Sequence, residues 1–445
     1  MALAAETTIP ATETAATPEV AKTETPKTQK YVLDNGLSII VREDHRSPIA
    51  TVQVWYKVGG SYESNGITGI SHALEHMMFR GTQKYPGNAF SRFIAINGGD
   101  NNAMTSKDFT VYFQDVGADQ VSLCFELEAD RMVNLTLPAE SFLEEIKVVK
   151  EERRLRYEDN PDMLTFERLN AAAYVNNPYH HMPIGWMNDL DNMTVEDLRA
   201  WYKTWYGPNN AVLVVAGDVK PEEIHQLAKK HFGPLQRIPI PTLKPRLEIP
   251  PIGGKRVRVE ANGTVPRLMM AYNVPSLSTV ASTDANEPYA LLVLLMALDG
   301  GNSARLSREL VRGKALMTSV YSMYDPFGAH ESLWFLSGVP TQNHTLPELE
   351  QAFLEQIRRL QTEPISNKEL NRVKTNVIAS YTFLQDSISE QALHLGMMEV
   401  LGYSWESYPS KIQQVTAAQV QAVAKKYLIP QRLTTAEFIP LNTGS

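Results

Sequence analysis

His72-Ala73-Leu74-Glu75-His76, at the start of the string HALEHMMFRGT (residues 72–82), is the stretch from which the fold and the chemistry of this chain can be worked out. On a helix, residues four apart lie one above the other, so the two imidazoles face the same side. Both can then reach one metal ion, and Glu75 projects beside them, close enough to take a proton from a water molecule. This order of residues is the zinc-protease motif H-E-x-x-H inverted.

The alternative is a pair of ordinary surface histidines, because a chance match to such a short pattern has a likelihood on the order of one or two in a hundred for a chain of this length. The neighbouring residues favour a helix. Thr68 and Ser71 are expected N-caps, and Gly81 is an expected stop signal. The apolar stripe of this helix is predicted to consist of Ile70, Ala73, Leu74 and Met77.

A third metal ligand is expected elsewhere, since catalytic zinc sites usually have three protein ligands and one open position. Residues 140–159 are predicted to form a long charged helix between Pro138 and Pro161. Its apolar stripe contains two carboxylates, Glu145 and Glu152, which lie two turns apart. A buried carboxylate needs a cation, a metal ion or several donors.

Two interpretations of these carboxylates are open. In the first, Arg156 or other arginines neutralise them. In the second, which the neighbouring motif favours, Glu152 is the third ligand and Glu145 supports the site from behind. Sequence spacing alone does not separate Glu151 from Glu152, but the helical face favours Glu152.

The string HALEHMMFRGT resembles the signature of the M16 family of inverted-motif metallopeptidases, the group of pitrilysin, insulin-degrading enzyme and mitochondrial processing peptidase. In this chain Glu152 stands 76 residues after His76, and Glu145 stands seven residues earlier, as the resembled family spaces its third ligand and a further Glu. The likeness covers roughly residues 30–440 and is closest to the short bacterial members with two domains. Other segments that resemble the family are residues 33–37, 98–105 with Asp108 and Tyr112, 177–179, 208–218 and 300–306.

For the site, the resemblance implies one zinc ion per chain, held by His72, His76 and Glu152. Glu75 would be the catalytic base and Glu145 a supporting catalytic residue.

For substrate, the resemblance implies a peptide bound in extended form along an edge strand, where Asn102, Ala103 and Thr105 would be the substrate-binding residues. The alternative for this strand is an ordinary edge that Lys107 and Asp108 protect from pairing.

The order of elements predicts an α+β fold, because strands followed by helices suggest layers and not a doubly wound sheet. We expect a flexible leader (1–28), a zinc-bearing domain (29–237), a linker rich in Pro and Gly (238–255) and a second, similar domain (256–445). The resemblance implies mixed, largely antiparallel sheets in two domains that face each other like a clamshell. The corresponding apolar helix of the second domain, residues 288–298, has no His pair, so only the first domain is expected to hold the metal.

The second half departs from the resembled family at one place. Active members carry an Arg and, seven residues later, a Tyr, which look like a substrate clamp and an oxyanion donor. Here the two positions hold Val311 and Thr318, while Arg312 and Tyr321 stand nearby but out of register. We therefore expect a heterodimer in which this chain is the zinc-bearing subunit and a partner of the same fold supplies the Arg/Tyr pair.

Composition excludes other classes of protein. A formal net charge of −8 argues against a nucleic-acid binder. The longest apolar run, residues 289–298, is too short to span a bilayer, and the single cysteine, Cys124, excludes both an intramolecular disulfide and a multi-Cys zinc site. Two interpretations of residues 2–5 are open: a simple flexible leader, or the remnant of a cleaved export signal, on which we base the expectation of a periplasmic location instead of a cytoplasmic one.

The sequence thus predicts a zinc metalloendopeptidase. Two alternatives are kept: a non-proteolytic structural or assembly subunit of the same fold, and a processing peptidase of narrow specificity.

Overall fold

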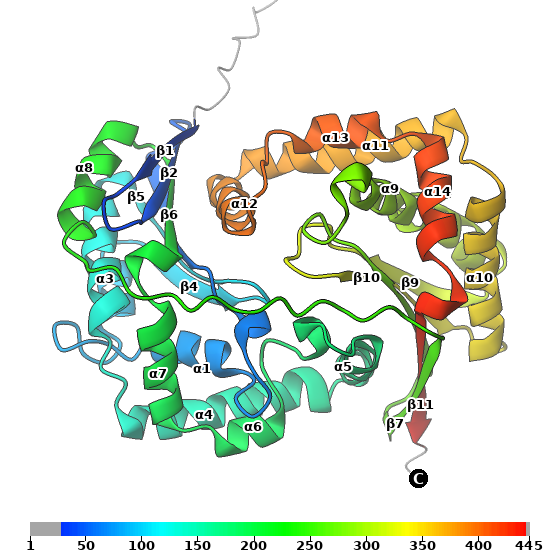
Figure 1. Cartoon of the computed structure of the whole chain (residues 1–445), viewed down its shortest axis with the longest axis horizontal. Coiled ribbons are helices and arrows are strands. Elements are labelled where there is room, and N and C mark those ends of the chain that lie inside the picture. Colours follow the sequence, from blue (N-terminus) through cyan, green and yellow to red (C-terminus); the bar gives the residue numbers. More distant parts are fainter. Residues whose placement is uncertain (1–27, 442–445) are drawn as a thin grey trace, which may run out of the picture.

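Two mixed β-sheets covered by helices organise the computed structural model, which describes residues 28–441 (Figure 1). The predicted leader therefore lies outside the described residues, except for Thr28. Each sheet contains one parallel pair of strands among antiparallel pairs. The predicted α+β class, with largely antiparallel sheets, is confirmed.

The first sheet has the strand order β1-β2-β6-β3-β5-β4, so β4 lies at an edge. Its parallel pair is β2 with β6. The strands are β1 (Thr28–Val32), β2 (Ser38–Glu43), β3 (Ile49–Tyr56), β4 (Asp100–Thr105), β5 (Thr110–Gly117) and β6 (Ala211–Gly217).

The second sheet has the order β7-β11-β8-β10-β9, with β9 at an edge and β7 parallel to β11. Its strands are β7 (Lys255–Asn262), β8 (Arg267–Val274), β9 (Met317–Met323), β10 (Ser332–Pro340) and β11 (Leu433–Leu441). The second sheet repeats the order and the pairing directions of five strands of the first sheet. In that order, the strands of the second sheet are β7-β11-β8-β10-β9 and their counterparts in the first are β2-β6-β3-β5-β4. The repeat that is faint in the sequence is therefore complete in strand topology, and β1 is an addition.

Fourteen named α-helices accompany the described strands. Those of the first half are α1 (Ile70–Met77), α2 (Ala89–Ile96), α3 (Val121–Asn134), α4 (Ala139–Arg153), α5 (Pro161–Ala173), α6 (Met187–Asn192), α7 (Val195–Trp205) and α8 (Pro221–His231). Those of the second half are α9 (Glu287–Asp299), α10 (Leu346–Thr362), α11 (Asn367–Phe383), α12 (Ile388–Leu401), α13 (Tyr408–Gln414) and α14 (Ala417–Tyr427). The predicted long helix at 140–159 is α4 continued by a π-helical turn, η3 (Arg154–Glu158).

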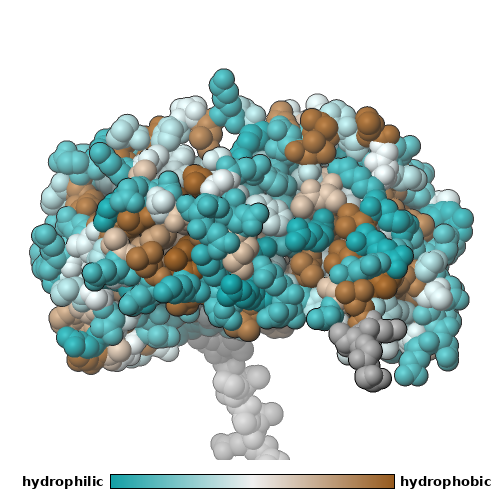
Figure 2. Space-filling model, turned by 90° about the horizontal axis from the view of Figure 1, so that it is seen from below, coloured by the Kyte–Doolittle hydropathy of each residue, from teal (hydrophilic) through white to brown (hydrophobic). Residues whose placement is uncertain are grey.

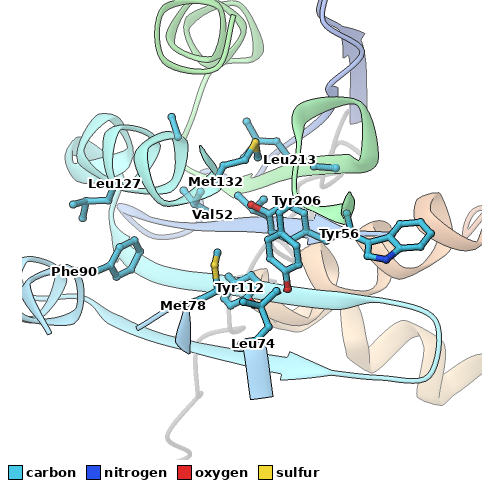
Figure 3. Close-up of a cluster of buried hydrophobic side chains, with 14 of the residues drawn as sticks. Val52, Tyr56, Leu74, Met78, Phe90, Tyr112, Leu127, Met132, Tyr206 and Leu213 are labelled. Atoms are coloured by element: carbon cyan, nitrogen blue, oxygen red, sulfur yellow. The ribbon is translucent and has the colours of Figure 1, made fainter. Parts of the chain in front are cut away.

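The core beside the candidate metal helix lies between one face of the first sheet and the helices α1 and α3 (Figure 3). Val52 and Tyr56 from β3 meet Leu74 from α1 and Met132 from α3, and all four side chains are buried. This packing fixes α1 against the sheet through its apolar stripe, so the opposite side of α1 is free to carry polar groups.

Each half contributes one helix to the sheet of the other half. The helix α12 packs against β3 and β6 of the first sheet, where it meets Trp55, and α5 packs against β7, β8 and β11 of the second sheet. Figure 1 shows α12 between the two halves. A Cβ atom at Gly396 of α12 would overlap the indole of Trp55, so the close approach requires glycine there. Both faces of the first sheet are covered as a result, which explains why β6 is buried along its whole length.

Further contacts join the halves. The carboxylate of Asp108 accepts hydrogen bonds from Ser61 Oγ (2.8 Å) and from the backbone N–H of Ala329 in the β9–β10 hairpin (3.1 Å). Residues 236–252 contain no helix or strand in the described chain, and they run between the halves as an extended connection. From this connection, the guanidinium of Arg246 donates to the carbonyl oxygens of Ser61 and Glu63. The predicted linker thus also holds the loop that precedes α1.

One face of the molecule is mostly hydrophilic. Figure 2 shows one face on which apolar residues form separate groups among hydrophilic ones. Within the described part of the chain, none of the helices is both long and apolar enough to cross a membrane.

Candidate metal centre

The helix α1 presents two different sides. Ile70, Ala73, Leu74 and Met77 are buried in the core, as the apolar stripe predicts. The three motif residues, His72, Glu75 and His76, are only half-buried and turn away from that core. The rings of His72 and His76 lie edge to face with their centroids 4.8 Å apart. The i, i+4 spacing therefore does bring the two imidazoles together.

The N-terminus of α1 is held by a residue that the sequence did not indicate. The expectation that Thr68 and Ser71 act as N-caps is wrong: the N-cap is Gly69, in a left-handed conformation (φ 88°), and no side-chain cap bond is formed there. The buried carboxylate of Glu63 instead accepts the backbone N–H groups of Gly69 (2.7 Å) and Ser71 (2.9 Å). Thr68 Oγ1 donates to Asp189. Burial raises the pKa of Glu63 to about 8, although the hydrogen bonds from these two N–H groups act to lower it.

Three side chains converge to form the candidate metal site. The Nε2 atom of His76 lies 3.4 Å from Glu152 Oε2, and that of His72 lies 3.7 Å from the same oxygen. One ligand atom from each residue lies within 4.8 Å of the others, and among the described residues this is the one such group of three or more His, Cys, Asp or Glu. The sequence predicted this set, with Glu152 drawn from α4 over a separation of 76 residues.

The geometry fits a tetrahedral zinc ion. Metal–ligand bonds of about 2.0–2.2 Å at tetrahedral angles place neighbouring ligand atoms about 3.3–3.5 Å apart. The two carboxylate–imidazole separations, 3.4 and 3.7 Å, lie at or just above that range. Burial lowers the pKa of His72 to about 4, so its ring is neutral near pH 7, which is the form that binds a metal.

Behind these ligands, carboxylates and arginines alternate. Glu145 Oε2 lies 3.1 Å from His76 Nδ1, and its other oxygen contacts the guanidinium of Arg80. Arg156 Nη1 lies 3.0 Å from Glu152 Oε1, which leaves Oε2 toward the histidines. Each carboxylate faces a histidine on one side and an arginine on the other, so the arginines of the first interpretation are present and the arrangement is also compatible with the second. A carboxylate on Nδ1 leaves Nε2 of His76 directed at the metal position.

Glu75 has a defined partner of its own. Thr105 Oγ1, at the end of β4, donates a hydrogen bond of 2.5 Å to Glu75 Oε2. Burial raises the pKa of Glu75, while the Thr105 hydrogen bond acts in the opposite direction. The sequence assigned Thr105 to substrate binding, but in the structure it also orients the carboxylate beside the metal ligands.

The predicted substrate strand β4 is an edge strand that pairs on one side only, with β5. Its residues alternate between exposed and half-buried positions. Ala103 and Thr105 lie on the half-buried face that meets α1, whereas Asn102 lies on the exposed face and accepts the N–H of Ala103 (2.9 Å) with its own side chain. The three predicted residues are therefore neighbours along one edge, but their side chains point to two sides.

The second half places no donor pair where the resembled family has one. Val311 packs against the second core, and Thr318 is an exposed residue of β9. Arg312, in the π-helix η7 (Leu306–Gly313), contacts the carbonyl of Asn302, and Tyr321 on β9 is 59% exposed. The hydrogen bonds and ion pairs of the metal centre described above come only from the first half.

Two contributors were missed by sequence reasoning, Arg80 and Glu63. A signal for Arg80 was present, because the buried Glu145 required a cation and Arg80 follows His76 by four residues. No local signal exists for Glu63, because its role depends on a loop that folds back over the helix N-terminus.

Comparison with known proteins gives a consistent result. A model described as Insulinase (Peptidase family M16) matches residues 38–184, and a model described as Peptidase M16 inactive domain matches residues 192–377. A protein named zinc protease PqqE, from Helicobacter pylori, is 30% identical over 93% of each chain. Mitochondrial-processing peptidase subunit beta from Blastocladiella emersonii is 25% identical over 94% of this chain and 89% of its own.

Among solved structures, a protease from Helicobacter pylori superimposes with a TM-score of 0.88 at 29% identity, covering 94% of this chain and 100% of its own. The likeness thus extends over both halves and includes the one that contains His72, His76 and Glu152.

Proposed function

This chain belongs to the M16 peptidase family, and from that premise we propose that it is a zinc-dependent endopeptidase. One observation carries the proposal: the convergence of His72, His76 and Glu152 on a single point beside Glu75. One zinc ion per chain, held by these three ligands, would supply a Lewis acid for activating water and polarising a peptide carbonyl.

The residues of the chain then perform the remaining chemistry. Glu75 accepts a proton from the attacking water at its carboxylate and returns it to the leaving amine. Thr105 holds Glu75 Oε2 in place by its hydrogen bond, so the free oxygen, Oε1, is the proton acceptor. Glu145 holds His76 through Nδ1 and acts as a positioning residue for the metal ligand.

The peptide lies in extended form along the unpaired edge of β4, from Asn102 to Thr105. Main-chain pairing there is largely indifferent to side chains, which suits hydrolysis of peptides of varied sequence. The Thr105–Glu75 hydrogen bond ties this strand to the catalytic base, so a peptide paired with β4 passes the reacting groups.

A partner completes the site in this proposal. Val311 offers no donor and Thr318 is too short to replace a phenol, and Arg312 is engaged with Asn302. A second subunit of the same fold would supply an Arg and a Tyr at these positions, and the relative named as a processing-peptidase subunit agrees with a subunit role. The predicted domain boundaries and the periplasmic location remain part of the proposal.

The test is a peptidase assay on the full chain, alone and as the complex that co-purifies with it from the native source. We expect activity in the complex and a loss of about 10²–10⁴-fold with Glu75→Gln, because that change removes the general base. The metal content of Glu75→Gln should stay at one zinc per chain. Equal activity of the chain alone and of the complex would contradict the partner, and zinc-loaded complex without any peptidase activity would favour a structural subunit.

A further inference from the structure

The second half contains a counterpart of the metal centre, and its position can be found residue by residue. The helix α9 follows β8 as α1 follows β3, and both helices are followed by a glycine with a left-handed backbone, Gly301 (φ 95°) and Gly81 (φ 93°). Counting back from these glycines places Leu292 at the position of His72 and Met296 at that of His76.

Burial supports this alignment. Leu292 and Met296 are half-buried, as His72 and His76 are, and the residues that follow each of the four are buried. The helix α11 corresponds in the same way to α4: matching the buried residues that precede them, Ile365 and Leu137, places Ser380 at the position of Glu152.

A pocket of about 270 Å³ lies at this counterpart site. Leu292, Met296 and Ser380, the three residues at the positions of the metal ligands, all line it. The convergence of three side chains is thus retained in the second half, but the atoms that they present are two apolar chains and a hydroxyl in place of two imidazoles and a carboxylate. A pocket with such walls cannot hold a zinc ion.

Aromatic rings form much of the wall. Trp405 is parallel to Tyr408 (5°, centroids 5.8 Å apart) and lies 4.5 Å from the ring centroid of Tyr381. Phe327 from the β9–β10 hairpin stands against Tyr408 at 5.7 Å, and Met296 adds an adaptable thioether. Among the described residues that line the pocket, none is an Asp, Glu, Lys or Arg, so a charged ligand would enter without a counter-charge.

The polar atoms at the pocket are few and define the ligand further. The ring of His394 is tilted by 36° against that of Trp405, with the centroids 4.6 Å apart, and its Nδ1 lies 2.9 Å from the carbonyl oxygen of Glu390, to which it donates. In the neutral ring, Nε2 is then an acceptor. Tyr381 and Tyr408, whose side chains carry hydroxyl groups, line the same space.

The volume of the pocket and the chemistry of its walls both favour an aromatic ligand. An apolar cavity of roughly 150 Å³ accommodates a benzene ring, so the larger pocket has room for a single or fused aromatic ring. We propose that the metal-free half binds an uncharged aromatic ring bearing an N–H or O–H group in this pocket, at the place that corresponds to the zinc site. The ring can belong to a free small molecule or to an aromatic side chain of a peptide, and the chemistry of recognition is the same for both.

The test is isothermal titration calorimetry on the full chain with indole, with p-cresol and with a blocked peptide that contains one tryptophan, each with and without a zinc chelator. We expect one site per chain with a Kd of roughly 0.1–1 mM for the free rings. Binding that survives the chelator separates this inference from the proposed peptidase function. Binding of the peptide alone identifies a side chain as the source, and binding of the free rings alone identifies a small molecule.

Two variants locate the site. Leu292→Trp fills the pocket and should weaken binding at least tenfold, while Phe383→Ala, an exposed aromatic that does not line the pocket, should leave the Kd unchanged. Thermal midpoints of both variants show that the fold is intact, and Trp405→Leu, which removes a wall, is a second route to weaker binding should Leu292→Trp misfold. The inference is overturned if none of the three ligands binds at 10 mM, or if both pocket variants bind as the wild type does.

Discussion

The two halves of this molecule share a strand topology and a helix order, yet among the described residues only the first half brings together a group of side chains that could hold a metal ion. The difference is concentrated at three equivalent positions: His72, His76 and Glu152 in the first half, and Leu292, Met296 and Ser380 in the second. Each trio lies on a helix pair that its own core already fixes in place. In each half, the packing of the helices brings three side chains together, and the chemical identity of those side chains determines which ligand can bind between them.

Replacing His72 and His76 by the residues at the equivalent positions of the second half should have the largest effect on metal binding and activity. His72→Leu combined with His76→Met gives the first half the side chains of the second at those positions. Two of three ligands are lost, so we expect zinc content to fall from one per chain to none and peptidase activity to disappear. The fold should persist, because α9 carries the same pair. Metal analysis tests the loss of zinc, and circular dichroism tests whether the fold persists. The control is Glu151→Gln, at an exposed neighbour of Glu152, which should keep its zinc.

The reverse exchange tests whether the second half is a latent metal site. Leu292→His, Met296→His and Ser380→Glu together should create a second zinc site, since the three positions already converge on one pocket. It should bind at least about 10–100-fold more weakly than the first, because Val373 stands where Glu145 supports His76. Adding Val373→Glu should recover part of that deficit. A metal titration that still saturates at one ion per chain would show that the two halves differ by more than these side chains.

Substitutions at the N-termini of α1 and α9 should have a smaller effect, and on stability instead of metal binding. The N-terminus of α1 rests on the buried carboxylate of Glu63, while the acidic residue in the first turn of α9, Glu287, pairs at the surface with Lys426. Glu63→Ala leaves two buried N–H groups without acceptors and should cost about 2–4 kcal/mol of unfolding free energy. Glu287→Ala should cost about 1 kcal/mol or less.

The contribution of Glu63 to the free energy of unfolding should also depend on pH. Its pKa of about 8 in the folded chain lies above the ordinary 4.5, so the folded state holds this proton more tightly than the unfolded state does. The resulting stability is complete below pH 4.5 and is lost as the pH rises through 8. The difference between wild type and Glu63→Ala in urea unfolding should therefore narrow from pH 5 to pH 8. A constant difference across that range would argue against a raised pKa.

Much of the site was accessible to sequence reasoning, because its geometry is local. A spacing of four on one helix brings His72 to His76, and the helical face of α4 separates Glu152 from the exposed Glu151. The family resemblance supplied the pairing between the two helices, which no local rule provides.

What sequence reasoning missed depends on contacts between distant segments. Glu63 reaches the start of α1 from a preceding loop, and Thr105 reaches Glu75 from a strand edge. The strands β7 and β11 were not anticipated from the sequence. Their parallel pairing joins the start of the second half to its end, over a separation that a local pattern does not record. The exchange of α5 and α12 between the sheets was likewise invisible in the chain order.

That exchange limits what can be removed from this chain. Cutting at the linker would strip α12 from the first sheet and uncover Trp55 and the outward face of β6, so we expect the isolated first half to aggregate. The second half is therefore a structural requirement of the first, since its helix α12 covers one face of the first sheet.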